Sequence, residues 1–245
     1  MLSSSILKRG LGAASIGTKM NGPILTQPPS SSVEDYLKAI WEVAGVDPAS
    51  TNDVAGRLSI APASVTNMFA RLQEMGLVNY ERYRGASLTK AGCAEALRLV
   101  RRHRLIETFL LEHLGYLWEE VHEEAERLEH AVSDEFTERL ARFLDHPARD
   151  PHGALIPAPD GTLEPDDSRP LNAAEVGERV CISRADHREA AALTYLGNHG
   201  LVPGRLLEVM EVRALDGVVT VRDEDGNLHS LGAPLVCSIF VRNPA

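Results

Sequence analysis

Apolar residues recur at helical spacing through the first part of the chain. From Val33 onward they fall three or four positions apart, which predicts a first helix that ends near Gly45. A second helix is expected over Thr51–Leu58. After a short link, a third is expected over Pro62–Met75, where the proline suits a first helical turn. Helices of this length joined by short turns are typical of a helix-turn-helix motif.

Two short runs of strand-like residues follow the third helix. Leu77–Tyr80 and Ala86–Thr89 flank the segment Glu81–Gly85, so we expect a β-hairpin with a basic tip. Helical periodicity then returns, and it predicts three further helices over Lys90–Leu114, Leu117–His130 and Ser133–Leu144.

The last hundred residues have a different pattern. His146–Pro170 holds six prolines and is expected to be an irregular linker. Beyond it, one helix is expected between Asp186 and Gly200, and strands are expected over Arg179–Ile182, Arg205–Val212, Gly217–Arg222 and Leu235–Val241. The fold is therefore predicted to be mainly α with a small all-β domain, which combines an N-terminal winged helix-turn-helix, a helical domain and a C-terminal SH3-like β-barrel.

The predicted domain boundaries follow these changes of pattern. Residues 1–31, rich in Ser, Gly and Pro, are expected to be a disordered extension, within which Met20 is an alternative start. The other boundaries are 32–94 for the winged helix-turn-helix, 95–150 for the helical domain, 151–170 for the linker and 171–245 for the SH3-like domain.

The composition is that of an ordinary globular protein, with 44% hydrophobic and 24% charged residues. No apolar stretch approaches the length that a bilayer span needs, and the N-terminal region lacks the pattern of a signal peptide. These features predict a cytoplasmic protein without a membrane partner. The three cysteines have no CxxC spacing, which argues against a disulfide framework or a cysteine zinc site.

The distribution of charge points to two kinds of surface. The net charge of −10 alone argues against a nucleic-acid partner. However, the stretch Val54–Arg104 carries nine Lys or Arg residues against three Glu, whereas Leu105–Asp150 carries thirteen acidic residues against four Arg. A basic block followed by an acidic block suggests one surface for phosphate and another site for cations.

The basic block coincides with a constellation that suits DNA recognition. Short polar side chains near the start of a recognition helix can reach base edges in the major groove, and a basic hairpin tip can reach the backbone as a wing. The alternative is a small helical domain with solvated charges. The candidate DNA-contacting residues are Ala63, Ser64, Thr66, Asn67, Arg71, Arg82, Tyr83 and Arg84.

The acidic block contains ligand-type residues at helical spacing. His122, Glu126, Glu129 and His130 fall on one stripe of the predicted helix, and six of the nine histidines lie between positions 103 and 152. On the preceding helix, His103 and Glu107 share a face. Imidazole and carboxylate ligands without thiolate suit Mn(II), Fe(II), Co(II) or Zn(II). The alternative is a pair of surface helices held by salt bridges.

Taken together, these motifs resemble the diphtheria toxin repressor family of metal-dependent transcriptional regulators, which includes iron repressors and manganese regulators. The resemblance extends from about Ser32 to the C-terminus. It is carried by Val33-Glu34-Asp35-Tyr36-Leu37, Pro62-Ala63-Ser64-Val65-Thr66, Tyr80-Glu81-Arg82-Tyr83-Arg84-Gly85, Arg102-His103-Arg104-Leu105-Ile106-Glu107, His122-Glu123-Glu124-Ala125-Glu126, Leu128-Glu129-His130 and Ser133-Asp134-Glu135.

The resemblance implies two metal sites. The first would be formed by His103, Glu107 and His122, with Glu189 as a ligand from the C-terminal domain, and the second by Asp35, Glu126, Glu129 and His130. Iron repressors of the family carry sulfur ligands at the positions of Asp35 and Glu126, so the two carboxylates here favour manganese. Manganese regulators tend to have Glu where this chain has Lys38, which argues for two separated sites and against a binuclear cluster.

The resemblance also implies how such a protein works. A homodimer would bind double-stranded DNA at an inverted-repeat operator, repress genes for metal uptake, and do so only with metal bound. The expected cofactor is Mn(II), with Fe(II) as the alternative and Zn(II), Co(II) or Cd(II) as substitutes in vitro.

Two other classes of protein remain open on sequence grounds. A winged-helix regulator that senses an organic ligand would use the His/Glu stripe only structurally. A metalloenzyme could also use such a stripe, but the chain has no nucleophile motif, phosphate loop or HExxH. We therefore expect that the chain is not an enzyme.

Overall fold

The computed structural model describes residues 30–44, 47–186 and 190–244. Nearly all of the extension predicted for residues 1–31 lies outside this part of the chain. The fold has two compact units, each described separately: residues up to Arg102 together with Pro157–Pro165, and His103–Ile156 together with the residues from Asp166 onward. Within the described residues, no helix combines the length and the apolar character that crossing a membrane requires.

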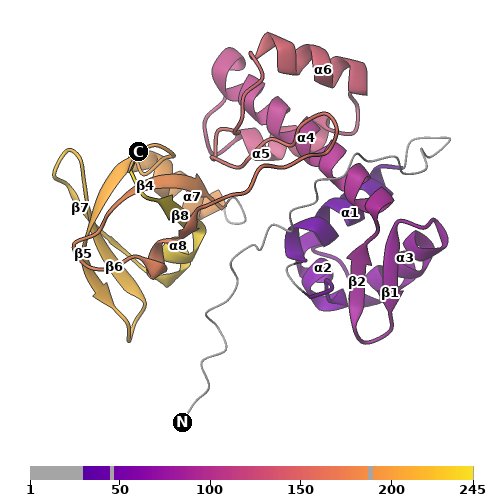
Figure 1. Ribbon diagram of the computed structural model, residues 1–245, viewed down its shortest axis with the longest axis horizontal. Helices are drawn as coiled ribbons and strands as arrows, with labels where there is room; N and C mark the ends of the chain where they lie inside the picture. Colours follow the sequence, from indigo (N-terminus) through magenta and orange to yellow (C-terminus); the bar gives the residue numbers. More distant parts are fainter. Residues whose placement is uncertain (1–29, 45–46, 187–189, 245) are drawn as a thin grey trace. The chain divides into compact units, whose positions relative to one another are not determined.

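The first unit contains three short helices, a hairpin and the first half of α4 (Lys90–Leu114) (Figure 1). The three short helices are α1 (Ser31–Val43), α2 (Thr51–Leu58) and α3 (Pro62–Glu74), as the apolar spacing predicted to within two residues. The Ser50 side chain caps α2 by accepting a hydrogen bond of 3.1 Å from the Asp53 amide. The core is built from side chains that recur at helical spacing, including Val33, Leu37, Ile40, Val54, Val65, Phe69 and Leu72.

The hairpin consists of β1 (Val78–Glu81) and β2 (Gly85–Leu88), paired antiparallel. Ala49 adds an isolated bridge to Ala86 on the far side of β2. Gly85 has a φ of +100°, and a Cβ atom there would overlap the carbonyl oxygen of Ala49. Only glycine therefore allows the hairpin to pack this closely against the segment before α2.

The helical part of the second unit contains the end of α4 (Lys90–Leu114), α5 (Val121–Leu128) and α6 (Asp134–Phe143). Leu105, Ile106 and Leu110 of α4 pack against residues of α5 and α6 in one core. The helix predicted over Leu117–His130 is shorter at both ends. Its first residues form a turn, and His130 lies beyond the last helical turn.

The proline-rich segment is more ordered than the predicted linker. The carboxylate of Asp150 accepts hydrogen bonds of 2.9 Å from the backbone amides of His152 and Ala154, which closes a tight turn. His152 is fully buried, and its carbonyl accepts a hydrogen bond from the Ala185 amide of the SH3-like domain. The first part of the segment, up to Ile156, is therefore a structural element of the second unit, whereas Pro157–Pro165 belongs to the first unit.

The SH3-like domain is an antiparallel sheet in the strand order β3-β8-β4-β5-β6-β7, with its helices packed on one core (Figure 1). Three strands agree with the predicted positions, with modest changes at their ends. The domain contains β3 (Arg169–Pro170), the 3-10 helix η1 (Leu171–Ala173), β4 (Arg179–Ala185), α7 (Ala190–Asn198), β5 (Leu206–Arg213), β6 (Val218–Asp223), β7 (Leu228–Leu231), α8 (Ala233–Ser238) and β8 (Ile239–Arg242).

Two features of this domain differ from the prediction. The strand expected over Leu235–Val241 is wrong in its first half, which forms α8, because Pro234 occupies the first helical turn and favours a helix start. Only Ile239–Arg242 is extended. The sequence reasoning also missed β3 and β7, two short edge strands of the sheet.

Candidate metal centre and nucleic-acid interface

The recognition helix α3 has one buried and one exposed face. Val65, Phe69 and Leu72 lie fully inside the core of the first unit. The opposite face carries the predicted DNA-contacting residues of the helix, and all of them are exposed: Ala63, Ser64, Thr66, Asn67 and Arg71. Packing of one face thus fixes the direction in which the polar face points.

The hairpin tip presents the three remaining candidates to solvent. Arg82, Tyr83 and Arg84 are exposed, and Tyr83 has a relative accessibility of 92%. The Arg82 guanidinium lies over the Tyr83 ring at 5.0 Å, while Arg84 forms an ion pair of 3.1 Å with Glu81. Two exposed arginines beside an exposed aromatic ring suit contact with a phosphate backbone.

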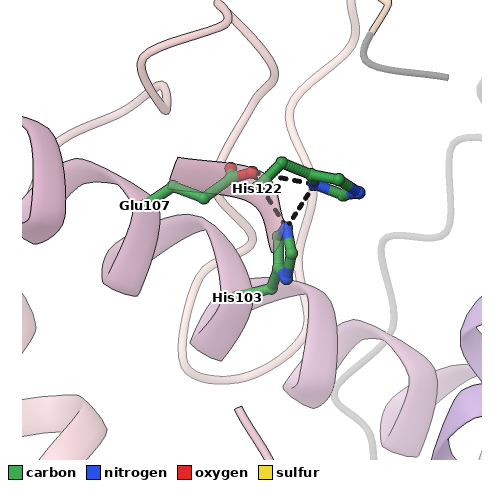
Figure 2. A group of neighbouring side chains, drawn as sticks. All are labelled: His103, Glu107 and His122. Carbon is green, nitrogen blue, oxygen red and sulfur yellow. Dashed lines mark hydrogen bonds and ion pairs between the residues drawn. The ribbon is translucent and has the colours of Figure 1, made fainter. Parts of the chain in front are cut away.

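The structure brings together His103, Glu107 and His122, the three residues that the family resemblance grouped as the first site (Figure 2). His103 and Glu107 lie one turn apart on α4, and α5 supplies His122. The Nε2 atom of His103 lies 2.9 Å from Glu107 Oε1 and 3.0 Å from Nδ1 of His122, which is itself 3.1 Å from Glu107 Oε1. Three ligand-type atoms from two helices therefore converge on one point.

The size of this triangle fits a metal ion. Ligand atoms held about 2.1 Å from a metal at right angles to one another lie about 3.0 Å apart, which is the edge of an octahedral face. The three observed separations are 2.9–3.1 Å. His103 and Glu107 are also almost completely buried. The donor set and its spacing therefore suit a divalent cation.

A second group joins α5 to the same histidine. His103, Glu126 and Glu129 offer ligand atoms within 4.8 Å of one another, and His103 Nδ1 lies 2.5 Å from Glu129 Oε2. His130 lies next to Glu129, with Nε2 3.6 Å from its Oε1. The sequence assigned His103 to one site and Glu126 and Glu129 to another, whereas the structure links the two groups through His103.

Two predicted ligands, Asp35 and Glu189, are not part of the groups described for the second unit. Asp35 lies on α1 in the first unit, so its part in a site with Glu126, Glu129 and His130 stays a prediction. Glu189 lies outside the described residues.

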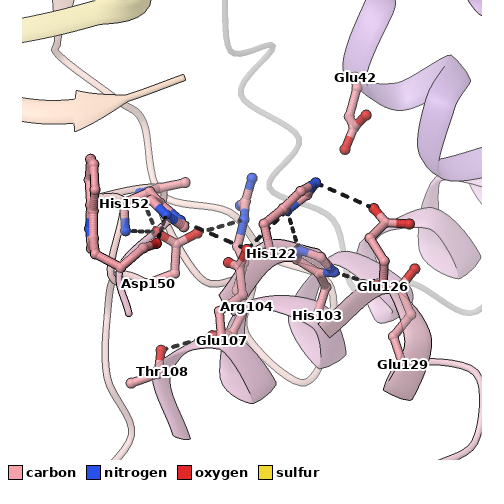
Figure 3. Close-up of polar contacts among 12 residues, drawn as sticks. Glu42, His103, Arg104, Glu107, Thr108, His122, Glu126, Glu129, Asp150 and His152 are labelled. Carbon is pink, nitrogen blue, oxygen red and sulfur yellow. Dashed lines mark hydrogen bonds and ion pairs between the residues drawn. The ribbon is translucent and has the colours of Figure 1, made fainter. Parts of the chain in front are cut away.

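A third group contains two residues that the sequence reasoning missed. Glu107, Asp150 and His152 offer ligand atoms within 4.8 Å of one another, and all three are buried (Figure 3). His152 Nδ1 lies 3.8 Å from Glu107 Oε1. The available signal was the excess of histidines between positions 103 and 152, which includes the Asp-Pro-His sequence at 150–152. The three groups overlap, so the ligand-type residues form a continuous series.

Burial and neighbouring charges shift the pKa values of Glu107 and Asp150, the two carboxyl groups of the third group, in opposite directions. Burial opposes ionisation of Glu107, but the contacts with His103 and His122 hold the pKa of its carboxyl well below the usual range. The pKa of Asp150 is raised, first by burial and then by the nearby charge of Glu107, although Arg104 at 3.4 Å opposes the shift. A divalent cation between them would remove the repulsion and favour ionisation of both.

Comparisons with known proteins agree with this architecture along nearly the whole described chain. Residues 30–86 match the family described as the N-terminal DNA-binding domain of iron-dependent repressors, and residues 89–158 match the family described as their metal-binding and dimerisation domain. Residues 169–243 match the FeoA domain.

Individual relatives point the same way. The HTH-type transcriptional regulator MntR of Lysinibacillus sphaericus is 37% identical over 117 residues, which span 47% of this chain and 84% of that protein. The iron-dependent repressor IdeR of Mycobacterium tuberculosis is 36% identical over 128 residues, which span 51% of this chain and 55% of that protein.

A solved structure of a manganese-dependent transcriptional repressor in complex with manganese has 37% identity and a TM-score of 0.82, covering 86% of this chain and all of that one. The fold shared with that structure agrees with the family matches, with the converging ligand-type residues and with the exposed face of α3. The chain belongs to the iron-dependent repressor family, the diphtheria toxin repressor and MntR proteins, and is a metal-responsive DNA-binding transcriptional repressor.

Proposed function

We propose that Mn(II) is the activating metal and that the overlapping ligand groups of the second unit bind it. The observation that carries the proposal is the convergence of His103, Glu107 and His122 at separations of 2.9–3.1 Å. Every ligand-type atom in the groups described is a nitrogen or an oxygen, and the carboxylates of Glu107, Glu126, Glu129 and Asp150 are as numerous as the imidazoles of His103, His122, His130 and His152. Such a set favours Mn(II) over softer ions, with Fe(II) as the alternative.

The full set of proposed ligands combines these groups with residues inferred from the sequence. Asp35 would supply a carboxylate from α1 to the group of Glu126, Glu129 and His130, and Glu189 would supply one from the SH3-like domain. The metal would then stabilise the arrangement of the recognition helices that binds DNA. Linkage requires that operator DNA raise the affinity for metal by the same factor.

The proposed DNA target is an inverted repeat that a homodimer reads, in genes for metal uptake. The exposed apolar side chains of the helical part supply a plausible dimer surface: Leu114, Leu117, Phe136 and Phe143. Phe143 packs edge-on to Phe109 and to His113, which forms one aromatic cluster within this surface. Two-fold symmetry would place two α3 helices on successive major grooves.

Fluorescence anisotropy tests the proposal directly. The purified chain is titrated onto labelled DNA from the neighbourhood of its own gene, with a chelator, Mn(II), anaerobic Fe(II) or Zn(II). We expect tight binding with Mn(II) and loss of binding with the chelator. Binding that ignores all metals would instead favour a regulator of the same fold that senses an organic ligand.

Two double variants distinguish the loss of proposed ligands from the loss of other charged side chains on the same helix. Glu126→Ala with His130→Ala removes proposed ligands from α5 and from the turn after it, and is expected to abolish the response to Mn(II). Glu123→Ala with Arg127→Ala removes an exposed ion pair from the same helix and is expected to preserve it. If both double variants lose the response equally, the effect arises from helix stability and the proposed ligands are wrong.

A further inference from the structure

A second histidine cluster lies in the SH3-like domain, apart from the ligand groups described above. His199 follows the last turn of α7, and His229 lies on β7. Their ring centroids are 6.0 Å apart and their planes are nearly perpendicular, at 85°. Residues 30 positions apart in the sequence are therefore brought together by the fold of this domain.

The partners of His229 fix its protonation pattern. Its Nε2 atom lies 3.0 Å from Oδ2 of Asp223. The same oxygen accepts hydrogen bonds from the side chains of Arg205 and Asn227, and Oδ1 of Asp223 accepts one from the backbone amide of Asn227. A carboxylate surrounded by donors is an acceptor, so Nε2 of His229 donates. In the neutral imidazole the lone pair then resides on Nδ1.

His199 also has one ring nitrogen engaged by a hydrogen-bond acceptor, the backbone carbonyl of Tyr195. Its Nδ1 atom lies 2.7 Å from the carbonyl oxygen of Tyr195, which can only accept, so Nδ1 donates and the lone pair is on Nε2. The Tyr195 ring stacks on the imidazole at 4.0 Å and limits its rotation. Each histidine thus has one nitrogen engaged as a donor and the other available as a ligand.

This arrangement is the one that metal-bound histidines adopt. A histidine that binds a metal usually donates its second N–H to a carboxylate or a backbone carbonyl, which fixes the ring and raises its basicity. Asp223 plays that part for His229, and the Tyr195 carbonyl plays it for His199. The C-terminal end of α7 adds the negative end of a helix dipole, which favours a cation.

We propose that His199 and His229 bind a divalent cation of the imidazole-preferring class, represented by Zn(II), Cu(II), Ni(II) and Co(II). With metal–nitrogen distances near 2.1 Å and a tetrahedral angle, two imidazole centroids lie about 5.2 Å apart. The observed 6.0 Å needs only a small movement, and His199 is exposed and can supply it. Water molecules complete the coordination, so the site remains open on one side.

The chemistry of this site differs from that of the helical core. Its two ligands are neutral nitrogens, and the carboxylate of Asp223 contacts the ring nitrogen of His229 that does not face the ion. Such a pair binds borderline ions and has little affinity for Mn(II). The SH3-like domain would therefore bind a different ion from the one that activates DNA binding.

NMR of the histidine ring nitrogens in the full chain, titrated with Zn(II), tests the inference. We expect His199 Nε2 and His229 Nδ1 to change at one common Zn(II) concentration. In His199→Gln, the concentration for half-maximal change at His229 should rise by at least about tenfold, and Asp223→Asn should raise it by about 10–100-fold. The control His146→Asn alters an exposed histidine elsewhere and should leave both signals unchanged.

The opposite results are equally clear. Two rings that respond at different Zn(II) concentrations, or a His229 signal that is insensitive to His199→Gln, would overturn the site. Circular dichroism of each variant is the check that the variant is folded. Mn(II)-dependent DNA binding, measured in parallel, should be unchanged in His199→Gln, so failure of this inference and failure of the proposed function have different signatures.

Discussion

The helical core and the SH3-like domain both orient histidines with carboxylates, but they place the carboxylates differently. In the core, Glu107 lies on the same side of His103 as His122, so a metal ion there would meet oxygen and nitrogen donors together, while Glu129 contacts the opposite ring nitrogen of His103. In the SH3-like domain, Asp223 contacts only the nitrogen of His229 that faces away from His199. The same residue types thus build a site rich in oxygen in one place and a pair of imidazoles in the other.

The difference shows that composition alone does not set metal preference. A carboxylate in front of the ion contributes charge and a hard ligand, whereas a carboxylate behind an imidazole contributes orientation. The histidines differ in burial as well, because His103 is almost completely buried while His199 is exposed, although Asp223 and His229 are buried too. The contrast can be tested by removing one element of each arrangement at a time.

The largest effect is expected for His103→Ala. His103 belongs to two of the three ligand groups, so its loss should remove the gain in DNA affinity that Mn(II) produces, which for couplings of this kind is about 5–150-fold. Anisotropy with and without Mn(II) measures the gain. His199→Ala is the control and should retain all of it. If His103→Ala keeps the gain, the core groups are not the sensor.

Gly153→Ala comes next, because it disturbs the turn that carries Asp150 and His152 without altering a ligand. Gly153 has a φ of +87°, and a Cβ atom there would overlap the carbonyl oxygen of Ser183. We expect a loss of about 1–3 kcal/mol in the free energy of unfolding, with weaker binding of Mn(II) measured by calorimetry. The control is Gly226→Ala, which has the same φ but open space around it.

Comparison of the two glycine variants isolates the packing of the turn. If both lose the same stability, only backbone strain matters and the turn is not held against β4. A larger loss for Gly153→Ala, together with weaker binding of Mn(II), would show that docking of the turn supports the third ligand group.

That turn also marks the limit of what the sequence could predict. Helical spacing located α2, α4 and α6 nearly to the residue, because each buries one face against a core that the pattern reveals. Asp150 and His152 follow no such period. They approach Glu107 through a turn held by the Asp150 side chain and by a backbone hydrogen bond to β4, so their role depends on tertiary contacts.

The pairing of His199 with His229 lay beyond prediction for the same reason. β7 is a four-residue edge strand without a strong apolar run, and it was missed, so its histidine had no predicted neighbour. The ligand stripe on α5 was visible because helical period brings its residues to one face. Even there, the link of Glu129 to His103 needed the packing of α5 on α4.

A smaller effect is expected from pH in the metal-free protein, and Glu107 and Asp150 should behave in opposite ways. The lowered pKa of Glu107 means that its ionised form stabilises the fold at neutral pH and that this stability is lost as pH falls through the folded pKa. Glu107→Gln should therefore lower Tm at pH 7, by about 2–4 °C for each kcal/mol lost, and by less at acidic pH.

Asp150 has a raised pKa, so its contribution has the opposite sign. Its protonated form is favoured in the fold, and that contribution is present at low pH and lost as pH rises through the folded pKa. Asp150→Asn should therefore raise Tm of the metal-free protein at pH 7 while weakening protection by Mn(II). Thermal denaturation in chelator from pH 4 to 7 measures both variants, and parallel curves for the two would contradict the assignment.

The smallest effect is expected for Asp225→Asn in the SH3-like domain. Asp225 is an exposed partner of Arg205, which also pairs with Asp223 and Glu224, and it makes no contact with His229 in the described structure. Its loss should change the free energy of unfolding by less than about 1 kcal/mol, because exposed ion pairs contribute little. The Zn(II) response of His229 should also be unchanged, in contrast to Asp223→Asn. Equal loss of that response in both variants would mean that local negative charge attracts Zn(II), and that orientation of the imidazole by Asp223 is not the cause.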